Sequence, residues 1–233
     1  MTKTLLRLCA VAAMAVAALP MPLPLHAANV TLTGWQFGSG GNVSGNMYAG
    51  VAGGFHGTLA GAGVYDAASF DTYCIELAEH FSFGAAPMAN YSVINGTNYF
   101  GALRADHMAR LMTYVADHPG VVDTAAESTS LQLAVWNIVY DNDYSVTVNS
   151  SFNDSSLYAS YANTLLAGAA ATSVVRYEVF ALQKAGTQDF LLSALLPRPN
   201  EAGSIRVDEP AGAVLTAAAL GAMFWLKRRR VRP

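Results

Sequence analysis

The segment that decides the fold is SLQLAVWNIVY, residues 130–140, which is apolar on nearly every side. Thr124 lies ahead of it, and Glu127 follows that threonine by three residues, the pattern of a capping box at a helix N-terminus. We therefore predict a helix that begins after Thr124 and ends near Tyr140. Because it is hydrophobic all round, this helix should lie buried at the centre of a domain.

Two further helices are predicted on either side of it in the chain. The first has apolar residues at helical spacing from Met108 to Val115, and the sequence DHPG at 117–120 ends it. The other runs from about Ser155 to Ala167, with Leu157 at the start of its apolar face. Together the three segments form a helical part in the middle of the chain.

Short strands are predicted before and after the helical part. Eleven of the 20 glycines lie between Ala28 and Gly63, among short stretches that suit strands joined by tight turns. The predicted strands are residues 30–33, 46–49, 57–59, 69–77, 174–182 and 189–192, with residues 184–187 as the last turn. This order predicts an α+β fold, a glycine-rich antiparallel β sheet or small barrel with an inserted helical segment of two to three helices.

Composition and charge exclude several classes of protein. Of the 233 residues, 53% are hydrophobic and 12% are charged, which argues against a disordered chain. All 16 acidic residues lie within residues 28–210, which hold only six of the 13 basic ones. We therefore expect no nucleic acid or other polyanion as a partner.

The N-terminal end has the pattern of a secretory signal peptide. Lys3 and Arg7 precede an apolar run at residues 8–19, and Leu-His-Ala at 25–27 offers a small residue for cleavage. Three prolines within residues 20–24 interrupt the run too soon for a membrane helix. We expect export after removal of residues 1–27, one domain over residues 28–194, and a linker over residues 195–209.

The C-terminal end, residues 210–233, has the pattern of a sorting tail. An apolar stretch of about 24 Å as a helix, residues 211–226, is followed by a basic cluster that would stay in the cytoplasm. With the preceding signature Asp208-Glu209-Pro210, this order resembles the PEP-CTERM tail of Gram-negative bacteria that produce exopolysaccharide, although Asp208 replaces the first proline. The resemblance implies an exosortase-like processing enzyme and delivery to the cell surface. The alternative is an unprocessed single-span membrane anchor.

Two residues of the central domain need an explanation. Once the signal peptide has left with Cys9, Cys74 is the single cysteine of an exported protein, so it has no intramolecular disulfide partner. Gln132 places an amide in the apolar helix, where unpaired burial would cost about 1–3 kcal/mol. Taken alone, each has an ordinary interpretation: a buried cysteine acting as a small hydrophobe, and a core glutamine with satisfied hydrogen bonds.

Taken together, the two segments resemble a known family. Tyr73-Cys74-Ile75-Glu76, followed later by Gln132-Leu-Ala-Val-Trp136, is similar to the thioester domain of bacterial surface proteins. The family's usual threonine before the glutamine is Leu131 here. The resemblance implies a thioester crosslink between Cys74 and Gln132, with Tyr73 and Trp136 supporting the site, and an amine-bearing surface or matrix molecule as the covalent partner.

Such a protein would act once, as an adhesin or matrix attachment, and would not be an enzyme. One alternative is a surface or matrix binding module without a thioester. Another is a cysteine hydrolase that pairs Cys74 with a histidine, the candidates being His56, His80, His107 and His118. We expect no cofactor and no metal, because the acidic segment 141–143 lacks the glycine and the distal glutamate of a calcium-binding loop.

Overall fold

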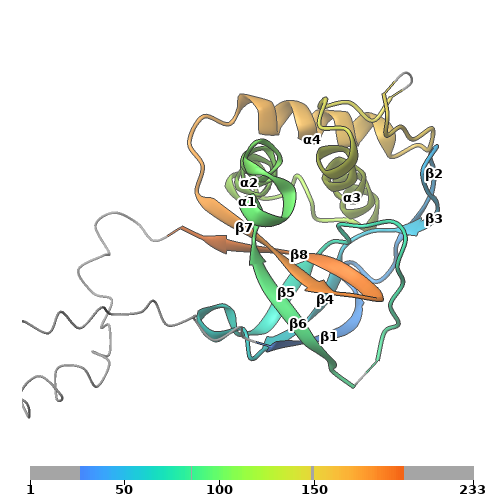
Figure 1. Ribbon diagram of the computed structural model, residues 1–233. Coiled ribbons are helices and arrows are strands. Elements are labelled where there is room, and N and C mark those ends of the chain that lie inside the picture. The colour runs from blue at the N-terminus through green and yellow to red at the C-terminus, as the bar shows by residue number, and fades with distance from the viewer. Residues whose placement is uncertain (1–26, 85, 148–149, 197–233) are drawn as a thin grey trace, which may run out of the picture.

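The computed structural model describes residues 27–84, 86–147 and 150–196 (Figure 1). The predicted signal peptide up to residue 26, most of the predicted linker, and the signature Asp208-Glu209-Pro210 with its tail lie outside these ranges. Within the ranges, no helix combines the length and hydrophobicity that a membrane crossing requires.

The main sheet has six strands in the order β5-β4-β1-β6-β7-β8, and every neighbouring pair is antiparallel. Its strands are β1 (Ala27–Trp35), β4 (Phe55–Ala60), β5 (Ala67–Thr72), β6 (Met88–Asn95), β7 (Tyr177–Lys184) and β8 (Thr187–Leu195). The sheet curls until its two edges, β5 and β8, meet (Figure 1). It is therefore a nearly closed, barrel-like sheet, and the mixed α+β class expected from the sequence is confirmed.

The residues that follow β5 close the sheet. The carbonyl of Tyr73 accepts a hydrogen bond from the backbone N–H of Leu191 (2.9 Å), and the N–H of Ile75 donates to the carbonyl of Asp189 (3.1 Å). Cys74 lies between these two bonds and forms a β-bridge with strand β8. The closure thus fixes the backbone of Cys74 on both sides.

Four helices separate β6 from β7: α1 (Gly96–Phe100), α2 (Ala102–Asp117), α3 (Ala125–Tyr140) and α4 (Ala159–Ala171). They gather on one side of the sheet, and α4 packs against both α2 and α3 (Figure 1). Helix α3 begins with the predicted capping box of Thr124 and Glu127 and is buried from Ser128 to Ile138. The core fills the space between α3, its neighbouring helices and the sheet.

A two-stranded hairpin, β2 (Gly41–Ser44) and β3 (Ala49–Ala52), packs against α3. The hydroxyl of Thr129 on α3 accepts a hydrogen bond from the N–H of Gly41 (3.0 Å) and donates to the carbonyl of Ala52 (3.0 Å). These bonds tie both strands of the hairpin to the helix.

Several expected elements differ from the structure. Residues 46–49 were predicted as a strand but are mainly the turn between β2 and β3, because the hairpin reverses there. The helical insertion has four helices instead of the expected two to three, because the sequence gave no signal for α1. Strand β6 was also not predicted. Helix α4 begins at Ala159 because the Asp154 carboxylate accepts a hydrogen bond from the N–H of Ser156 (2.7 Å) and holds a turn there, which leaves Leu157 exposed instead of buried.

Candidate functional site

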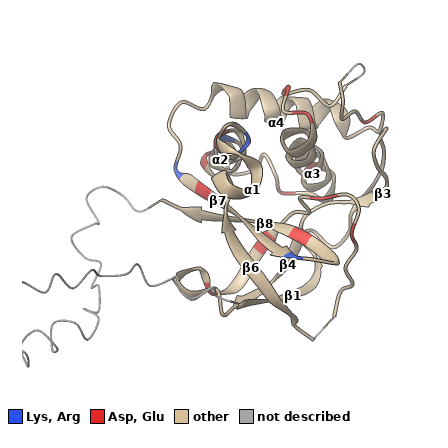
Figure 2. Ribbon diagram, in the orientation of Figure 1, with Lys and Arg blue, Asp and Glu red and all other residues tan. Residues whose placement is uncertain are grey.

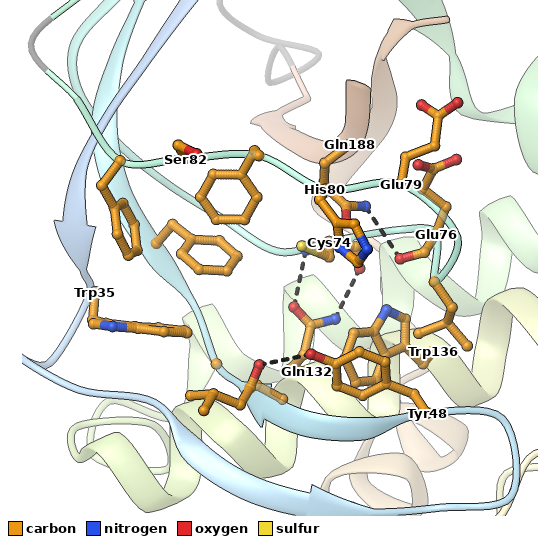
Figure 3. A pocket seen from close by; sticks show the side chains of 17 residues that line it. Trp35, Tyr48, Cys74, Glu76, Glu79, His80, Ser82, Gln132, Trp136 and Gln188 are labelled. Carbon is orange, nitrogen blue, oxygen red and sulfur yellow. Dashed lines mark hydrogen bonds between the residues drawn. The ribbon is translucent and has the colours of Figure 1, made fainter. Parts of the chain in front are cut away.

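Cys74 and Gln132 lie in direct contact. The Gln132 side chain points from α3 to the closing segment of the sheet, where its Oε1 accepts a hydrogen bond from the backbone N–H of Cys74 (2.9 Å). Its Nε2 donates to the carbonyl of the same residue (2.8 Å). The carboxamide therefore pairs with the backbone of Cys74 as a neighbouring strand would, and Figure 3 shows it beside the thiol.

Both side chains are buried, with Cys74 7% exposed and Gln132 1% exposed. Cys74 has a free thiol. The chain brings the pair together across 58 positions because α3 packs under the seam at which the sheet closes. The sequence places these two residues in separate elements, and only the packing of helix on sheet makes them neighbours.

The pair lies at the inner end of a pocket of about 510 Å³. Aromatic rings form much of its wall: Trp35, Tyr48, Phe55, Phe81, Phe83 and Trp136. The rings interlock at centroid distances of 4.7 Å for Phe55 with Phe81 and 5.0 Å for Trp35 with Phe55. This packing places apolar surface beside the thiol and the amide, whereas Glu76, Glu79 and His80 line the same pocket with polar groups.

Trp136 stands one helical turn after Gln132 on α3 and is 3% exposed. Its ring packs against that of Tyr48, with centroids 5.0 Å apart. Its indole Nε1 is buried and has no hydrogen-bond partner among the described residues. Trp136 thus lines the pocket and has an unpartnered donor among the described residues.

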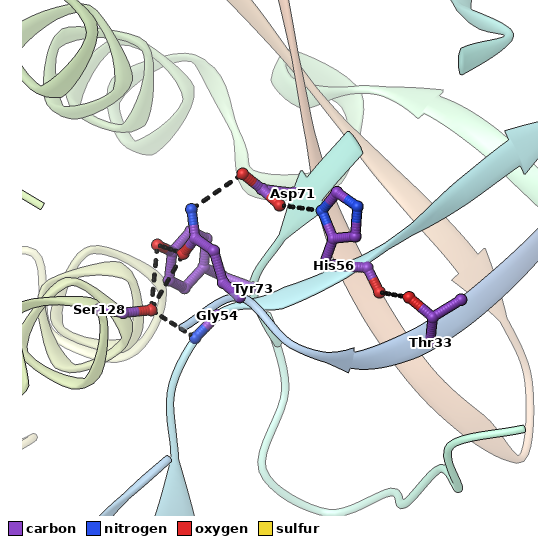
Figure 4. A network of polar contacts seen from close by, with 7 residues as sticks. Thr33, Gly54, His56, Asp71, Tyr73 and Ser128 are labelled. Atoms are coloured by element: carbon purple, nitrogen blue, oxygen red, sulfur yellow. Dashed lines mark hydrogen bonds and ion pairs between the residues drawn. The ribbon is translucent and has the colours of Figure 1, made fainter. Parts of the chain in front are cut away.

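Tyr73 supports the site from outside the pocket. Its hydroxyl donates a hydrogen bond to the Gln36 side chain (2.8 Å) and lies 3.4 Å from the hydroxyl of Ser128 on α3. The same serine accepts a bond from the N–H of Gly54 (2.8 Å), and Figure 4 shows how this network joins the sheet to the first turns of the helix. Tyr73 therefore ties α3 to the closing segment of the sheet that contains Cys74.

The surroundings keep the thiol in its neutral form. Burial raises the pKa of Cys74 well above its ordinary value, and the negative charge of Glu76 raises it further. A thiolate at this position would be largely cut off from solvent, and no Lys or Arg among the described residues lines the pocket to pair with it. At neutral pH, Cys74 is accordingly a thiol, unlike the activated thiolates of cysteine enzymes.

Glu76, which the sequence reasoning did not single out, lines the same pocket. Burial, followed by the charges of Asp189 and Glu79, raises the pKa of Glu76 to about 7. In the sequence, the signal for Glu76 was its spacing from Cys74 in the strand predicted at residues 69–77, because residues two apart on a strand lie on the same face. Acidic side chains outnumber basic ones throughout the described part of the chain (Figure 2).

Of the four candidate histidines, one lies in the pocket of Cys74 and three lie outside it. His80 lines the pocket of Cys74. His56 pairs with Asp71 (2.8 Å), as Figure 4 shows, whereas the remaining two lie elsewhere, His107 against Asn142 and His118 against a backbone carbonyl of its own helix. A hydrolase would therefore have to use His80.

The acidic segment after α3 holds backbone and side chains in place. The Asp143 carboxylate accepts hydrogen bonds from the Asn137 side chain (2.8 Å) and from the N–H of Ser145 (2.9 Å). Asp141 accepts a bond from the N–H of Phe152 (3.0 Å). Within the described ranges, no cluster of three or more His, Cys, Asp or Glu side chains is arranged to hold a metal ion.

No family model and no curated protein matches this chain. Among solved structures, it is similar to the N-terminal thioester domain of a surface protein from Clostridium perfringens, in a cysteine-to-alanine mutant form. The two are 12% identical, the match covers 72% of this chain and 99% of that one, and the TM-score is 0.44. The case for a function comes from the contacts of Cys74 and Gln132 themselves.

Proposed function

We propose that this chain is an exported cell-surface protein in which Cys74 and Gln132 form an intramolecular thioester that captures an amine-bearing partner covalently. The observation that carries the proposal is the double hydrogen bond between the Gln132 carboxamide and the backbone of Cys74. It holds an amide carbonyl beside a buried free thiol in a pocket that opens to solvent.

The thioester would form by acyl transfer from nitrogen to sulfur. The Cys74 sulfur attacks the Gln132 side-chain carbon, the carbon–nitrogen bond breaks, and ammonia leaves with the thiol proton. The backbone N–H that already donates to Gln132 Oε1 polarises this carbonyl and stabilises the negative charge that develops on its oxygen. Because burial raises the pKa of Cys74, its proton has to leave the sulfur during the attack and pass to the departing nitrogen.

The same surroundings favour storage of the acyl group. A thiol of raised pKa is a slower leaving group, and the aromatic wall limits the access of water, so hydrolysis should be slow. An amine that enters the pocket would displace Cys74 and leave a stable amide on Gln132. The protein would then be spent, and for this reason we propose a covalent adhesin or matrix attachment and not an enzyme.

Export and sorting complete the proposal. The signal peptide over residues 1–27 would take the chain out of the cytoplasm. The tail over residues 210–233 would bring it to an exosortase-like enzyme or hold it in the membrane until it is processed. The partner would be an amine-bearing molecule of the extracellular matrix or of another surface.

The intact mass of the purified chain tests the proposal. A wild-type mass low by one ammonia, with Cys74→Ala and Gln132→Ala at their full calculated masses, is the expected result. Treatment with methylamine should then replace the missing ammonia with one methylamine adduct. A full wild-type mass with a thiol that titrates after denaturation would refute the thioester.

Tryptic mapping locates the bond. Cleavage after Arg104, Arg110 and Arg176 separates Cys74 from Gln132, so a thioester would join two peptides that otherwise run apart. The joined pair should disappear after methylamine treatment, and the adduct should lie in the peptide that contains Gln132. An ammonia loss that maps elsewhere would contradict the assignment.

One observation favours a second candidate, a binding module without a thioester. Both polar atoms of the Gln132 amide have hydrogen-bond partners, so the residue is also stable as an ordinary core glutamine. In that case the chain keeps its full mass, and the aromatic pocket would bind its partner without a covalent bond.

A further inference from the structure

Glu76 has a feature that the thioester alone does not explain. It follows Cys74 by two residues and lines the same pocket, where its Oε1 is buried without a hydrogen-bond partner in the described part of the chain. The carboxyl group of the neighbouring Glu79 accepts a bond from the N–H of Gly186 (3.0 Å) and is close enough to hydrogen-bond Glu76 when one of the two is protonated. When both carboxyl groups are ionised, the buried Oε1 of Glu76 lacks a donor among the described residues, which is costly, and a cationic ligand would supply one.

Trp136 provides a second, independent observation in the same pocket. Its side chain is 3% exposed, and its unpartnered indole nitrogen lies on the edge of the ring toward Glu76 in Figure 3. The pocket therefore contains one unused acceptor and one unused donor. Among the described residues, no Lys or Arg lines this pocket and His80 is its one basic side chain, so a permanent positive charge inside it would come from the bound molecule. Lys184 lines a neighbouring pocket with Glu76 and Glu79, where its Nζ lies 5.8 Å from the centre of the Tyr91 ring.

We propose that Glu76 binds the ammonium group of the incoming partner and takes its proton, so that the site selects primary alkylammonium groups, such as a lysine side chain, over hydroxyl groups. This inference rests on the thioester of the proposed function. A hydroxyl carries no positive charge and would gain nothing from the carboxylate. An acceptor beside the amine, such as a peptide carbonyl of the target, would pair with the indole N–H of Trp136.

The step balances in protons and bonds. The ammonium gives one proton to the Glu76 carboxylate, and the freed lone pair attacks the thioester carbon of Gln132. The new nitrogen–carbon bond forms, the carbon–sulfur bond breaks, and a second proton passes from nitrogen to the departing Cys74 sulfur. The products are an amide, a neutral thiol and a protonated Glu76, which returns its proton to solvent.

The fixed position of Glu76 and its raised pKa both suit a residue that takes a proton from the incoming amine. The closing segment of the sheet holds the backbone of Glu76, whose carbonyl accepts a hydrogen bond from Gln188 Nε2 (3.1 Å). Its pKa of about 7, raised first by burial, makes it a stronger base than an exposed glutamate. A base with a pKa near the working pH is the kind that transfers protons most effectively.

Glu76→Gln tests the inference, with Glu178→Gln, at a glutamate of β7 outside the pocket, as the matched control and His80→Asn for the rival base. Each variant is first weighed for the loss of ammonia and then treated at pH 7 with methylamine, which is cationic, or hydroxylamine, which is largely neutral. We expect Glu76→Gln to slow methylamine capture about 10- to 100-fold and hydroxylamine capture less than about threefold. The other two variants should resemble wild type with both amines.

A measurement on the wild type covers the case in which Glu76→Gln fails to fold. Tetramethylammonium carries the charge but cannot be acylated, so it should slow methylamine capture and leave hydroxylamine capture unchanged, with sodium chloride as the ionic-strength control. If the chain loses ammonia but methylamine and hydroxylamine capture are slowed equally or not at all, the role of Glu76 is refuted and the thioester remains. The same holds if His80→Asn, and not Glu76→Gln, slows methylamine capture. A full wild-type mass would overturn the thioester and the inference together.

Discussion

Replacing Gln132 by leucine tests whether its amide holds the helix to the seam of the sheet. The substitution is best made in a Cys74→Ala background, in which neither protein can form a thioester and the backbone of residue 74 is unchanged. Leucine is apolar, one bond shorter than glutamine, and has no hydrogen-bonding group. The difference between the two proteins then isolates the pair of hydrogen bonds at 2.9 and 2.8 Å.

The expected magnitude follows from what the leucine leaves behind. The N–H and the carbonyl of residue 74 lose their partners in a region where Gln132 is 1% exposed. Each unsatisfied buried group costs about 1–3 kcal/mol, while removing a polar amide from the core returns roughly 1–2 kcal/mol. We therefore expect the free energy of unfolding to fall by about 1–4 kcal/mol.

Urea unfolding followed by circular dichroism measures this difference. Ser160→Leu, an exposed position on α4, is the control in the same background and should change the free energy of unfolding by no more than about 0.5 kcal/mol. A loss below about 1 kcal/mol for Gln132→Leu would mean that the two hydrogen bonds do not hold the helix to the sheet. The geometric basis of the candidate site would then be refuted.

Three further predictions concern the surroundings of the site. Thr124→Ala removes the hydroxyl that accepts the N–H of Glu127 (3.2 Å) and should lower the free energy of unfolding by about 1 kcal/mol in urea titrations. Trp136→Ala opens the pocket beside Gln132 and should cost about 3–5 kcal/mol in the same assay, and mass spectrometry should show faster loss of any thioester to water. Because the pKa of Glu76 is raised from 4.5 to about 7 in the folded state, the folded protein binds more protons than the unfolded one between these values, so stability should fall as pH rises through that window. Thermal unfolding from pH 4 to 8 should show a flatter dependence for Glu76→Gln.

Local patterns were enough for the elements whose signals lie within a few residues. The capping box of Thr124 and Glu127 marked the start of α3, and its uniform apolarity predicted its burial. The pattern DHPG at 117–120 marked the end of α2, which the structure places at Asp117. These signals are reliable because capping and helical periodicity depend on neighbours three or four residues apart.

Elements that depend on distant partners were missed or misplaced. Strand β6 has one fully buried side chain, Tyr91, and is otherwise half-buried or exposed, so it shows little alternation, yet it is needed to pair β1 with β7. The aromatic wall was also missed, because Phe81 and Phe83 belong to a segment without regular structure and meet Phe55 only in the folded chain.

The sequence by itself determined the α+β class with its helices between two groups of strands, the burial of α3, and the presence of a lone thiol and a core amide. It also supplied the two short patterns around Cys74 and Gln132 that suggested their chemistry. The tertiary structure alone decided that these residues meet, that Glu76 joins them in one pocket, and that Tyr73 supports the site from outside. The reason is physical: periodicity and capping are local, whereas a contact across 58 residues exists only after the sheet closes at β5 and β8 and α3 packs beneath the seam.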